Sequence, residues 1–371
     1  MRTLILLFLL FATAVRADEL LPGLLSAPLL VPVTISGSEL LLDGFVVRPD
    51  RPGRFPLVIV THGTPSMGGE AFVRELSKRS PIAFNSAAVA FAQRGFAAVA
   101  IMRRGFGRSG GVYSEAVQSD CDYLPAVRAS AEDVIAALTT LRKEPWVDPD
   151  HIVLLGHSMG GLAVTAAAAA NPAGVVGVLN FDGGLHWRSD QDQACESKSL
   201  VDAWAALGRS THVPALWIYA ENDHSYGPDL ARRMFDAYNT GGAPAQLHVV
   251  APFGSDGHDL IIRAPAETWL PAVEPFLTQL ALPTALVIQL PLPLELPAPP
   301  NARPVCQKVF TNYLAYRSEA KAFAATPQGG CGAGSGRTID EARADAMADC
   351  AAGTHNGACQ LYAIGQHLAE H

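Results

Sequence analysis

Short apolar segments alternate with longer helical segments over residues 56–282. The apolar segments lack the in-out alternation of half-exposed strands, which indicates strands covered by helices on both faces. Because parallel neighbours need a crossover helix, the alternation predicts an α/β fold with a doubly wound, mostly parallel sheet. Residues 29–36 and 39–49 should add antiparallel strands at its front edge. The expected inner strands are 56–63, 97–102, 151–156, 175–184, 214–223 and 245–252, and the expected helices are 130–144, 160–170 and 229–239.

The charge distribution limits the kinds of partner. The chain has 27 basic and 35 acidic residues, a formal net charge of −8, and no run of lysine or arginine. It therefore lacks the basic stripe typical of nucleic-acid-binding proteins. We expect a small-molecule partner and neither nucleic acid nor, after removal of the first residues, a membrane. No cofactor is expected, and the oligomeric state stays open.

The first residues resemble a signal peptide. Arg2 precedes an apolar stretch over residues 4–15, and Val15 and Ala17 suit the −3 and −1 positions of a cleavage site. Twelve apolar residues are too few to span a bilayer as a helix. The sequence therefore predicts a signal peptide over residues 1–17 and a periplasmic or secreted protein.

The six cysteines and the prolines indicate how the chain is divided. Residues 18–282 form the expected main domain, and a proline-rich linker over 283–304 leads to a small module over 305–371. No cysteine lies in a CxxC pair and no His–Cys cluster has zinc spacing, so no metal site is expected. An exported protein with an even number of cysteines instead suggests disulfides. The expected pairs are Cys121–Cys195, Cys306–Cys331 and Cys350–Cys359. Within the module, 338–350 should be a helix and 305–317 and 359–366 should be strands.

The segment "GHSMGG" places Ser158 between an expected strand and an expected helix. Gly156-x-Ser158-x-Gly160 at such a turn is the pattern of a nucleophile elbow, in which the glycines make room around a strained serine. We therefore expect Ser158 to be a catalytic nucleophile at the carboxyl edge of the sheet.

Two later loops offer the acid and the base that an activated serine needs. "ENDHSYGP" follows one expected strand, and "GSDGH" follows the next. We assign Asp223 as the acid, with Glu221 as the alternative, and His258 as the general base. His248 lies within an expected strand and is expected to be structural, and His224 is expected to be an ordinary loop histidine.

The loop "THGTP" should supply part of an oxyanion hole. It follows the strand expected beside that of Ser158, and its donor is Thr64 or Gly63, with Thr64 favoured, because Pro65 has no N–H. The N–H of Met159 would be the second donor. The glycine-rich loop over 102–111 lacks a phosphate-binding pattern, and we expect one of its arginines to pair with a buried carboxylate.

Together, "HGTP", "RRGFGRSGG", "GHSMGG", "FDGG", "YAENDHSYGP" and "GSDGH" resemble the α/β-hydrolase superfamily. The similarity is greatest to its dienelactone-hydrolase-like and prolyl-oligopeptidase-like branch and covers residues 40–282. The resemblance implies the same three catalytic residues: Ser158 as nucleophile, Asp223 as acid and His258 as base. In dienelactone hydrolases themselves, the residue at the elbow resembles the cysteine nucleophile of a cysteine enzyme, whereas this chain has Ser158 at that position. In this fold the insertion over 185–213 implies a small cap, in which Trp187 and Trp204 either line a substrate pocket or pack the cap.

These observations predict a serine hydrolase that cleaves a carboxylic ester or related acyl bond. The alternatives are a small-substrate serine peptidase and a non-catalytic binding protein that retains the hydrolase fold. The substrate is not predicted by the sequence.

Overall fold

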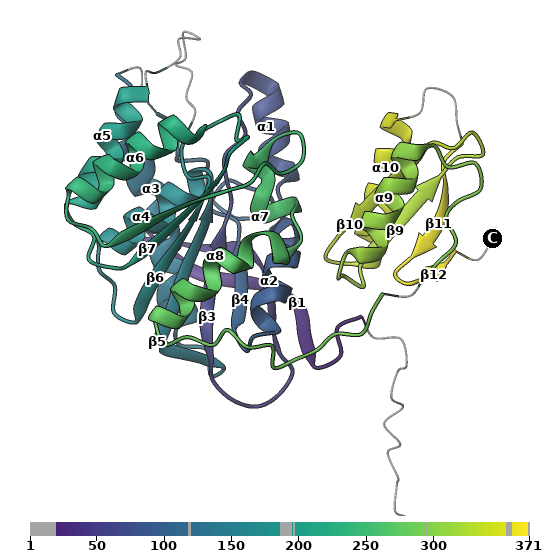
Figure 1. Ribbon diagram of the computed structural model, residues 1–371, viewed down its shortest axis with the longest axis horizontal. Coiled ribbons are helices and arrows are strands. Elements are labelled where there is room, and N and C mark those ends of the chain that lie inside the picture. The colour runs from purple at the N-terminus through teal and green to yellow at the C-terminus, as the bar shows by residue number, and fades with distance from the viewer. Residues whose placement is uncertain are drawn as a thin grey trace, which may run out of the picture.

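The computed structural model describes residues 20–117, 120–185, 195, 197–293, 295–353 and 358–369. It shows a large α/β domain joined to a small C-terminal module (Figure 1). The expected signal peptide lies outside the described residues. Within those residues, no helix is both long and apolar enough to cross a membrane.

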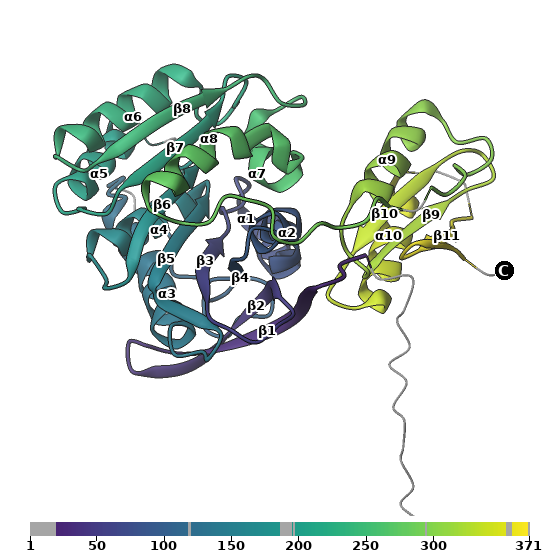
Figure 2. The same cartoon turned by 60° about the horizontal axis from the view of Figure 1, so that its bottom comes forward.

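The large domain contains an eight-stranded sheet in the order β1-β2-β4-β3-β5-β6-β7-β8. Pairing is parallel from β4 through β3 to β8, whereas β1 and β2 pair antiparallel at one edge (Figure 2). The expected mostly parallel sheet with antiparallel front strands is therefore confirmed. The strands are β1 (Leu24–Ile35), β2 (Ser38–Pro49), β3 (Phe55–Thr61), β4 (Ala97–Ile101), β5 (Val147–His157), β6 (Val175–Phe181), β7 (Ala215–Ala220) and β8 (Ala245–Val250).

Helices cover both faces of this sheet, as the continuous apolarity of its strands predicts. Along β3, Leu57 and Ile59 face one apolar core, and Val58 and Val60 face the other. Helices α3–α6 pack on the first face, and α2 and α8 pack on the second. The helices are α1 (Gly69–Lys78), α2 (Asn85–Ala92), α3 (Leu124–Leu141), α4 (Met159–Ala169), α5 (Ser197–Gly208), α6 (Pro228–Thr240), α7 (Leu260–Arg263) and α8 (Ala266–Gln279), with short 3-10 turns at Pro81–Phe84 and Gly257–Asp259.

Helix α5 forms the second half of the insertion in which a cap is expected. It lies in the insertion over 185–213, but it packs beside α6 in the helical layer and connects the parallel strands β6 and β7. A parallel pair requires such a crossover, which accounts for this part of the insertion. Residues 186–194 and 196 of the insertion lie outside the described residues.

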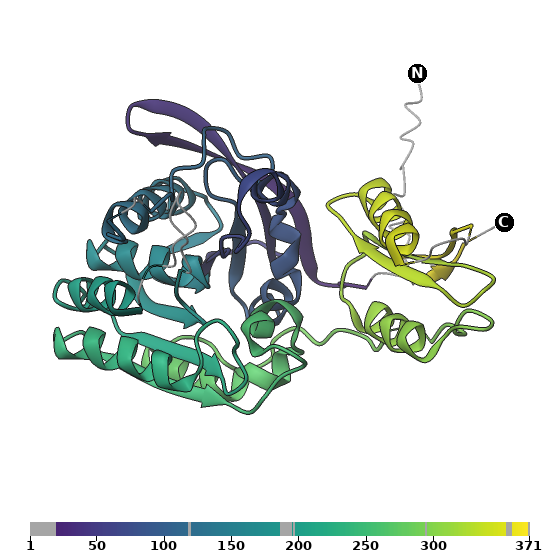
Figure 3. The same ribbon diagram turned by 90° about the horizontal axis from the view of Figure 1, so that it is seen from above.

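The C-terminal module has a four-stranded antiparallel sheet in the order β10-β9-β11-β12. Helix α10 covers one face and α9 covers the other (Figure 3). The helix expected over 338–350 and the strand expected over 359–366 are confirmed. The elements are α9 (Pro304–Ala315), β9 (Lys321–Ala325), β10 (Cys331–Ser335), α10 (Ile339–Gly353), β11 (Gln360–Ile364) and β12 (His367–Leu368).

The strand expected over 305–317 is wrong, because these residues form α9. The valine, phenylalanine and tyrosine residues of this segment favour a strand. In the structure, however, Pro304 begins a helix, and the buried residues are Cys306, Phe310 and Tyr313. That spacing of four and three residues places all three on one face of a helix.

Three disulfides join the same cysteine pairs that the sequence predicts. Cys121 is bonded to Cys195 in the large domain, and the module contains Cys306–Cys331 and Cys350–Cys359. The first bond ties the loop before α3 to the segment before α5. The other two bonds tie α9 to β10 and α10 to the segment before β11.

The module contacts the large domain through charged and polar groups. Arg337 pairs with Asp43, and both side chains are almost completely buried. Arg108 pairs with Glu341, and the Asn85 amide donates to the carbonyl of Arg317 at 2.8 Å. The segment between the two parts also lies on the large domain, since its Ile288 N–H donates to the Gln93 carbonyl at 3.0 Å.

Candidate active site

Ser158 lies on a sharp turn between β5 and α4. Its backbone has φ of 55° and ψ of −124°, a conformation that L-residues rarely adopt and that surrounding packing must enforce. A Cβ atom at Gly156 would lie 2.0 Å from the carbonyl oxygen of Gly160, so the turn requires glycine there. The serine stands at the N-terminus of α4, where the helix dipole stabilises negative charge.

Asp223 and His258 lie in the loops after β7 and β8, as expected. His258 Nδ1 is 3.2 Å from Asp223 Oδ2. The other carboxylate oxygen accepts hydrogen bonds from the backbone N–H groups of Ser225 at 2.7 Å and Tyr226 at 2.9 Å. Burial opposes ionisation of Asp223, yet the His258 and backbone hydrogen bonds hold the pKa of this carboxyl below its ordinary value. An ionised Asp223 therefore orients the imidazole through Nδ1.

Ser158 and His258 line one cavity of about 210 Å³ at the carboxyl edge of the sheet. Within the described part of the chain, no hydrogen bond joins the Ser158 hydroxyl to the His258 ring. Such bonds are often long without substrate and tighten in the reacting complex. The other lining residues are Gly63, Thr64, Pro65, Ser66, Met67, Arg79, His157, Leu185, Ser225, Tyr226, Asp259 and Ile262.

The loop after β3 reaches the same cavity. A Cβ at Gly63 would lie 2.7 Å from the Ser158 Cβ, so the loop backbone approaches the serine as closely as glycine permits. Thr64 lines the cavity beside it. Met159 is the first residue of α4, and the first N–H groups of a helix have no partner within it. The two expected oxyanion donors thus lie on the two backbone segments that flank Ser158.

His157 is a site residue that sequence reasoning missed. Its Nε2 is 2.7 Å from the carbonyl oxygen of His258, which makes this nitrogen the donor and links the elbow to the histidine loop. Burial and the neighbouring His258 lower the pKa of His157 to about 3, so it is neutral. In the sequence, only its position directly before Ser158 could have indicated that His157 belongs to the site.

Asp182 was also missed, although "FDGG" marks it. It lies fully buried after β6, and its Oδ1 accepts from the Ala220 N–H at 3.4 Å. Burial and the nearby charge of Asp223 raise the pKa of Asp182 well above its ordinary value. Both effects oppose the ionisation of Asp182 next to Asp223.

Several sequence candidates lie elsewhere. Trp204 does not line the cavity; it is fully buried, with its ring 4.2 Å from that of Trp217. This corrects its assignment to a substrate pocket, because the crossover helix α5 turns it toward the sheet. Trp187 lies outside the described residues. Glu221, His224 and His248 are exposed and do not line the cavity.

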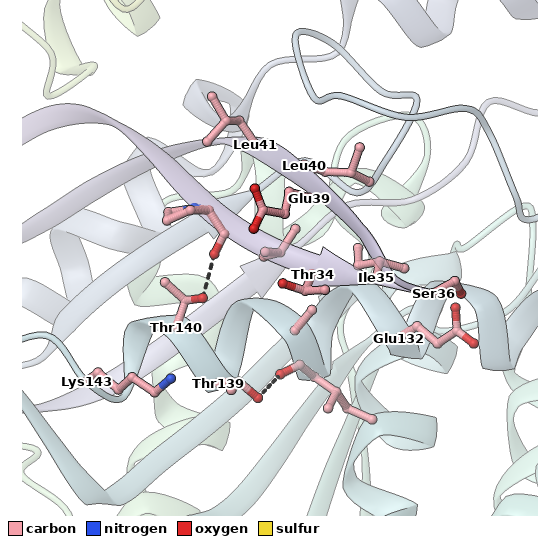
Figure 4. Close-up of a pocket in the computed structure, with 14 residues that line it drawn as sticks. Thr34, Ile35, Ser36, Glu39, Leu40, Leu41, Glu132, Thr139, Thr140 and Lys143 are labelled. Carbon is pink, nitrogen blue, oxygen red and sulfur yellow. Dashed lines mark hydrogen bonds between the residues drawn. The ribbon is translucent and has the colours of Figure 1, made fainter.

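A larger cavity of about 960 Å³ lies between the β1–β2 hairpin and α3 (Figure 4). Its charged lining residues are Glu39, Glu132 and Lys143. None of the described residues that line it is a histidine or a cysteine. Among the residues placed by the structure, no group of three or more His, Cys, Asp or Glu could hold a metal ion.

The chain is similar to one protein family and to several solved structures. The model of the family described as serine aminopeptidase, S33, matches residues 82–191, which include the elbow. No curated protein matches the chain. Its fold is similar to a putative dienelactone hydrolase from Klebsiella pneumoniae, with 16% identity, TM-score 0.46, and 70% and 98% of the two chains covered.

Two further solved structures are similar. The acylaminoacyl peptidase of Pyrococcus horikoshii has 16% identity and TM-score 0.47, over 69% of this chain and 41% of that one. Est1E of Butyrivibrio proteoclasticus has 15% identity and TM-score 0.42, over 66% and 98% of the two chains.

Proposed function

We propose that this chain is a serine hydrolase of the α/β-hydrolase superfamily, and that it cleaves a carboxylic ester or a related acyl bond by way of an acyl-enzyme. One observation carries the proposal: Ser158 on a strained elbow and an Asp223-bound His258 line one cavity. A strained serine has a structural cost of order 1–3 kcal/mol, and such strain gathers at functional sites.

In the proposed first step, Ser158 Oγ attacks the substrate carbonyl carbon. His258 Nε2 accepts the hydroxyl proton as the new C–O bond forms, and Asp223 stabilises the resulting imidazolium. The leaving alcohol takes that proton when its bond to the acyl carbon breaks. Water then attacks the acyl carbon while His258 takes one of its protons. When the bond between the acyl carbon and Ser158 Oγ breaks, His258 returns that proton to Oγ and the acid product leaves.

The backbone N–H groups of Thr64 and Met159 are the proposed oxyanion donors. Each such donor stabilises the tetrahedral intermediate, and loss of one typically reduces kcat by about 10²–10³. The positive end of the α4 dipole acts in the same direction.

The size of the cavity favours a small acyl group. Pockets for drug-sized ligands span about 300–1,000 Å³, whereas this cavity has about 210 Å³. We expect acetyl and butyryl esters to be turned over faster than octanoyl esters of the same alcohol. A serine peptidase acting on short substrates is the second candidate, favoured by the match to the serine aminopeptidase family.

Export is the remaining part of the proposal. It is supported by the signal-like first residues and by the three disulfides, which form in oxidising compartments.

Replacement of the nucleophile tests the proposal. Ser158→Ala should reduce hydrolysis of p-nitrophenyl acetate by about 10⁶, with the thermal unfolding midpoint kept within a few degrees. The wild-type protein should be labelled by a fluorophosphonate probe and the variant should not. A variant that keeps a tenth of the activity, or an unlabelled wild type, would show that Ser158 is not an activated nucleophile.

A further inference from the structure

A buried ion pair lies directly behind the loop of Thr64. Arg103 and Glu115 are 0% and 1% exposed, and their side chains pair through two contacts, one of them Arg103 Nη2 to Glu115 Oε2 at 3.0 Å. This pair confirms the expectation that an arginine of the loop over 102–111 meets a buried carboxylate. A buried ion pair contributes little to stability compared with apolar side chains of similar volume, so its presence calls for another explanation.

The pair holds both ends of the loop after β3. Arg103 Nη1 donates to the hydroxyl of Thr61 at 2.8 Å and to the carbonyl of His62 at 2.6 Å. On the other side, the Thr64 hydroxyl donates to Glu115 Oε2 at 2.9 Å. Each of these bonds involves a charged group, and such bonds are shorter and stronger than neutral ones.

The His62 ring carries the constraint into the backbone. The Arg103 N–H donates to His62 Nε2 at 3.0 Å, so this nitrogen is an acceptor. Burial and the Arg103 charge lower the pKa of His62, so the ring is neutral and its single proton lies on Nδ1. Nδ1 is 2.8 Å from the carbonyl oxygen of Gly63 and donates to it.

The direction of that carbonyl determines the direction of the next N–H. In a planar trans peptide, the C=O of Gly63 and the N–H of Thr64 point in opposite directions. With the Gly63 carbonyl turned toward the His62 ring, the Thr64 N–H points away from it. On the side away from His62, Gly63 lies against Ser158 and Thr64 lines the cavity.

We infer that the Arg103–Glu115 pair is a positioning unit that fixes the Gly63–Thr64 peptide as an oxyanion donor beside Ser158. The inference rests on the proposed serine-hydrolase function. It assigns Arg103, Glu115 and His62 a role in transition-state stabilisation through Thr64, without contact with the substrate.

Three variants test the inference by p-nitrophenyl acetate kinetics. Thr64→Val removes only the hydroxyl bond to Glu115 and should lower kcat about tenfold with KM unchanged. Glu115→Gln should lower kcat about 10–100-fold. The double variant Arg103→Met/Glu115→Leu should fold, because apolar side chains replace both charges, yet its kcat should stay as low as that of Glu115→Gln.

Glu132→Gln is the matched control. Glu132 pairs with Arg104, the neighbour of Arg103, but its side chain is 52% exposed and does not line the cavity that contains Ser158. Its kcat should stay within twofold of the wild type.

Inhibition by phenylboronic acid separates positioning from stability. Its tetrahedral adduct with serine places an oxygen in the oxyanion hole, so Ki should rise by the same factor as kcat/KM falls across the variants. Recovery of wild-type kcat and Ki in the double variant would overturn the inference, as would an unchanged Thr64→Val. If Glu115→Gln does not fold, Thr64→Val and the double variant decide alone. A wild type that neither turns over the ester nor takes up a fluorophosphonate would instead refute the proposed function.

Discussion

Asp223 is buried, yet its pKa stays below the ordinary value because three groups donate hydrogen bonds to its oxygens: the His258 ring and the backbone N–H groups of Ser225 and Tyr226. Removing its charge should leave the loop in place but let His258 adopt the wrong tautomer. We therefore expect Asp223→Asn to lower kcat on p-nitrophenyl acetate by about 10⁴. Glu221→Gln is the matched control, and its kcat should be nearly unchanged because that side chain is exposed. The opposite ranking would move the acid to Glu221.

His157 should make the large domain sensitive to acid. Its pKa is about 3 in the folded protein and about 6.5 in an unfolded chain. Between these values only the unfolded state binds the proton, so stability falls as pH falls from 6.5 toward 3. From pH 6.5 to 5.0 the loss should be about 1.5–2 kcal/mol, and His157→Asn should remove this part. Urea unfolding followed by tryptophan fluorescence measures this loss of stability. All five tryptophans lie before residue 270, so the fluorescence reports on the large domain and not on the module. An identical pH dependence in the variant would contradict this account.

At the scale of elements, local patterns predicted most of the structure. The strand, turn and helix around Ser158 are encoded within about 20 consecutive residues, and the cysteines of the module lie close in sequence. Most contacts between distant residues were not predicted, although the Cys121–Cys195 bond, which spans 74 residues, was. The role of His62 depends on Arg103, 41 residues away, and the burial of Trp204 depends on how α5 crosses the sheet. Segment α9 was misassigned because residue preference and helical spacing disagree there.

The core beneath α10 should depend on its disulfide. Its fully buried members are Ala322, Ala324, Ala342, Ala346 and Cys350. Alanine buries little apolar area, so this face contributes little hydrophobic stabilisation. Closing the loop from Cys350 to Cys359 contributes about 2.7 kcal/mol in the loop-entropy model.

The variant Cys350→Ser/Cys359→Ser should therefore let trypsin cut after Arg343, within α10, at least tenfold faster than in the wild type. Hydrolysis of p-nitrophenyl acetate should stay within twofold, because the candidate site lies in the other domain. Mass spectrometry of the fragments identifies the cut. Equal rates of cleavage would show that packing alone holds α10.

At the scale of the whole molecule, the module should stabilise the large domain without taking part in its chemistry. Ser158, Asp223, His258 and Thr64 all precede the connecting segment, so truncation after Leu290 should leave kcat on a small ester within about twofold. The same truncation removes Arg337 from Asp43, whose side chain is 4% exposed in the full chain. A carboxylate left without its partner should lower the free energy of unfolding of the large domain by about 1–3 kcal/mol.

Asp43→Asn distinguishes loss of this pair from a general effect of truncation. In the full chain it should destabilise the large domain, because Arg337 loses its counter-charge. In the truncated chain it should be neutral or stabilising, because the unpaired charge is gone. Urea unfolding of the four proteins, read by tryptophan fluorescence, gives the coupling between Asp43 and the module. A zero coupling would mean that the Arg337–Asp43 contact does not link the two parts energetically. A large loss of kcat in the folded, truncated chain would instead place residues 305–371 in the catalytic machinery.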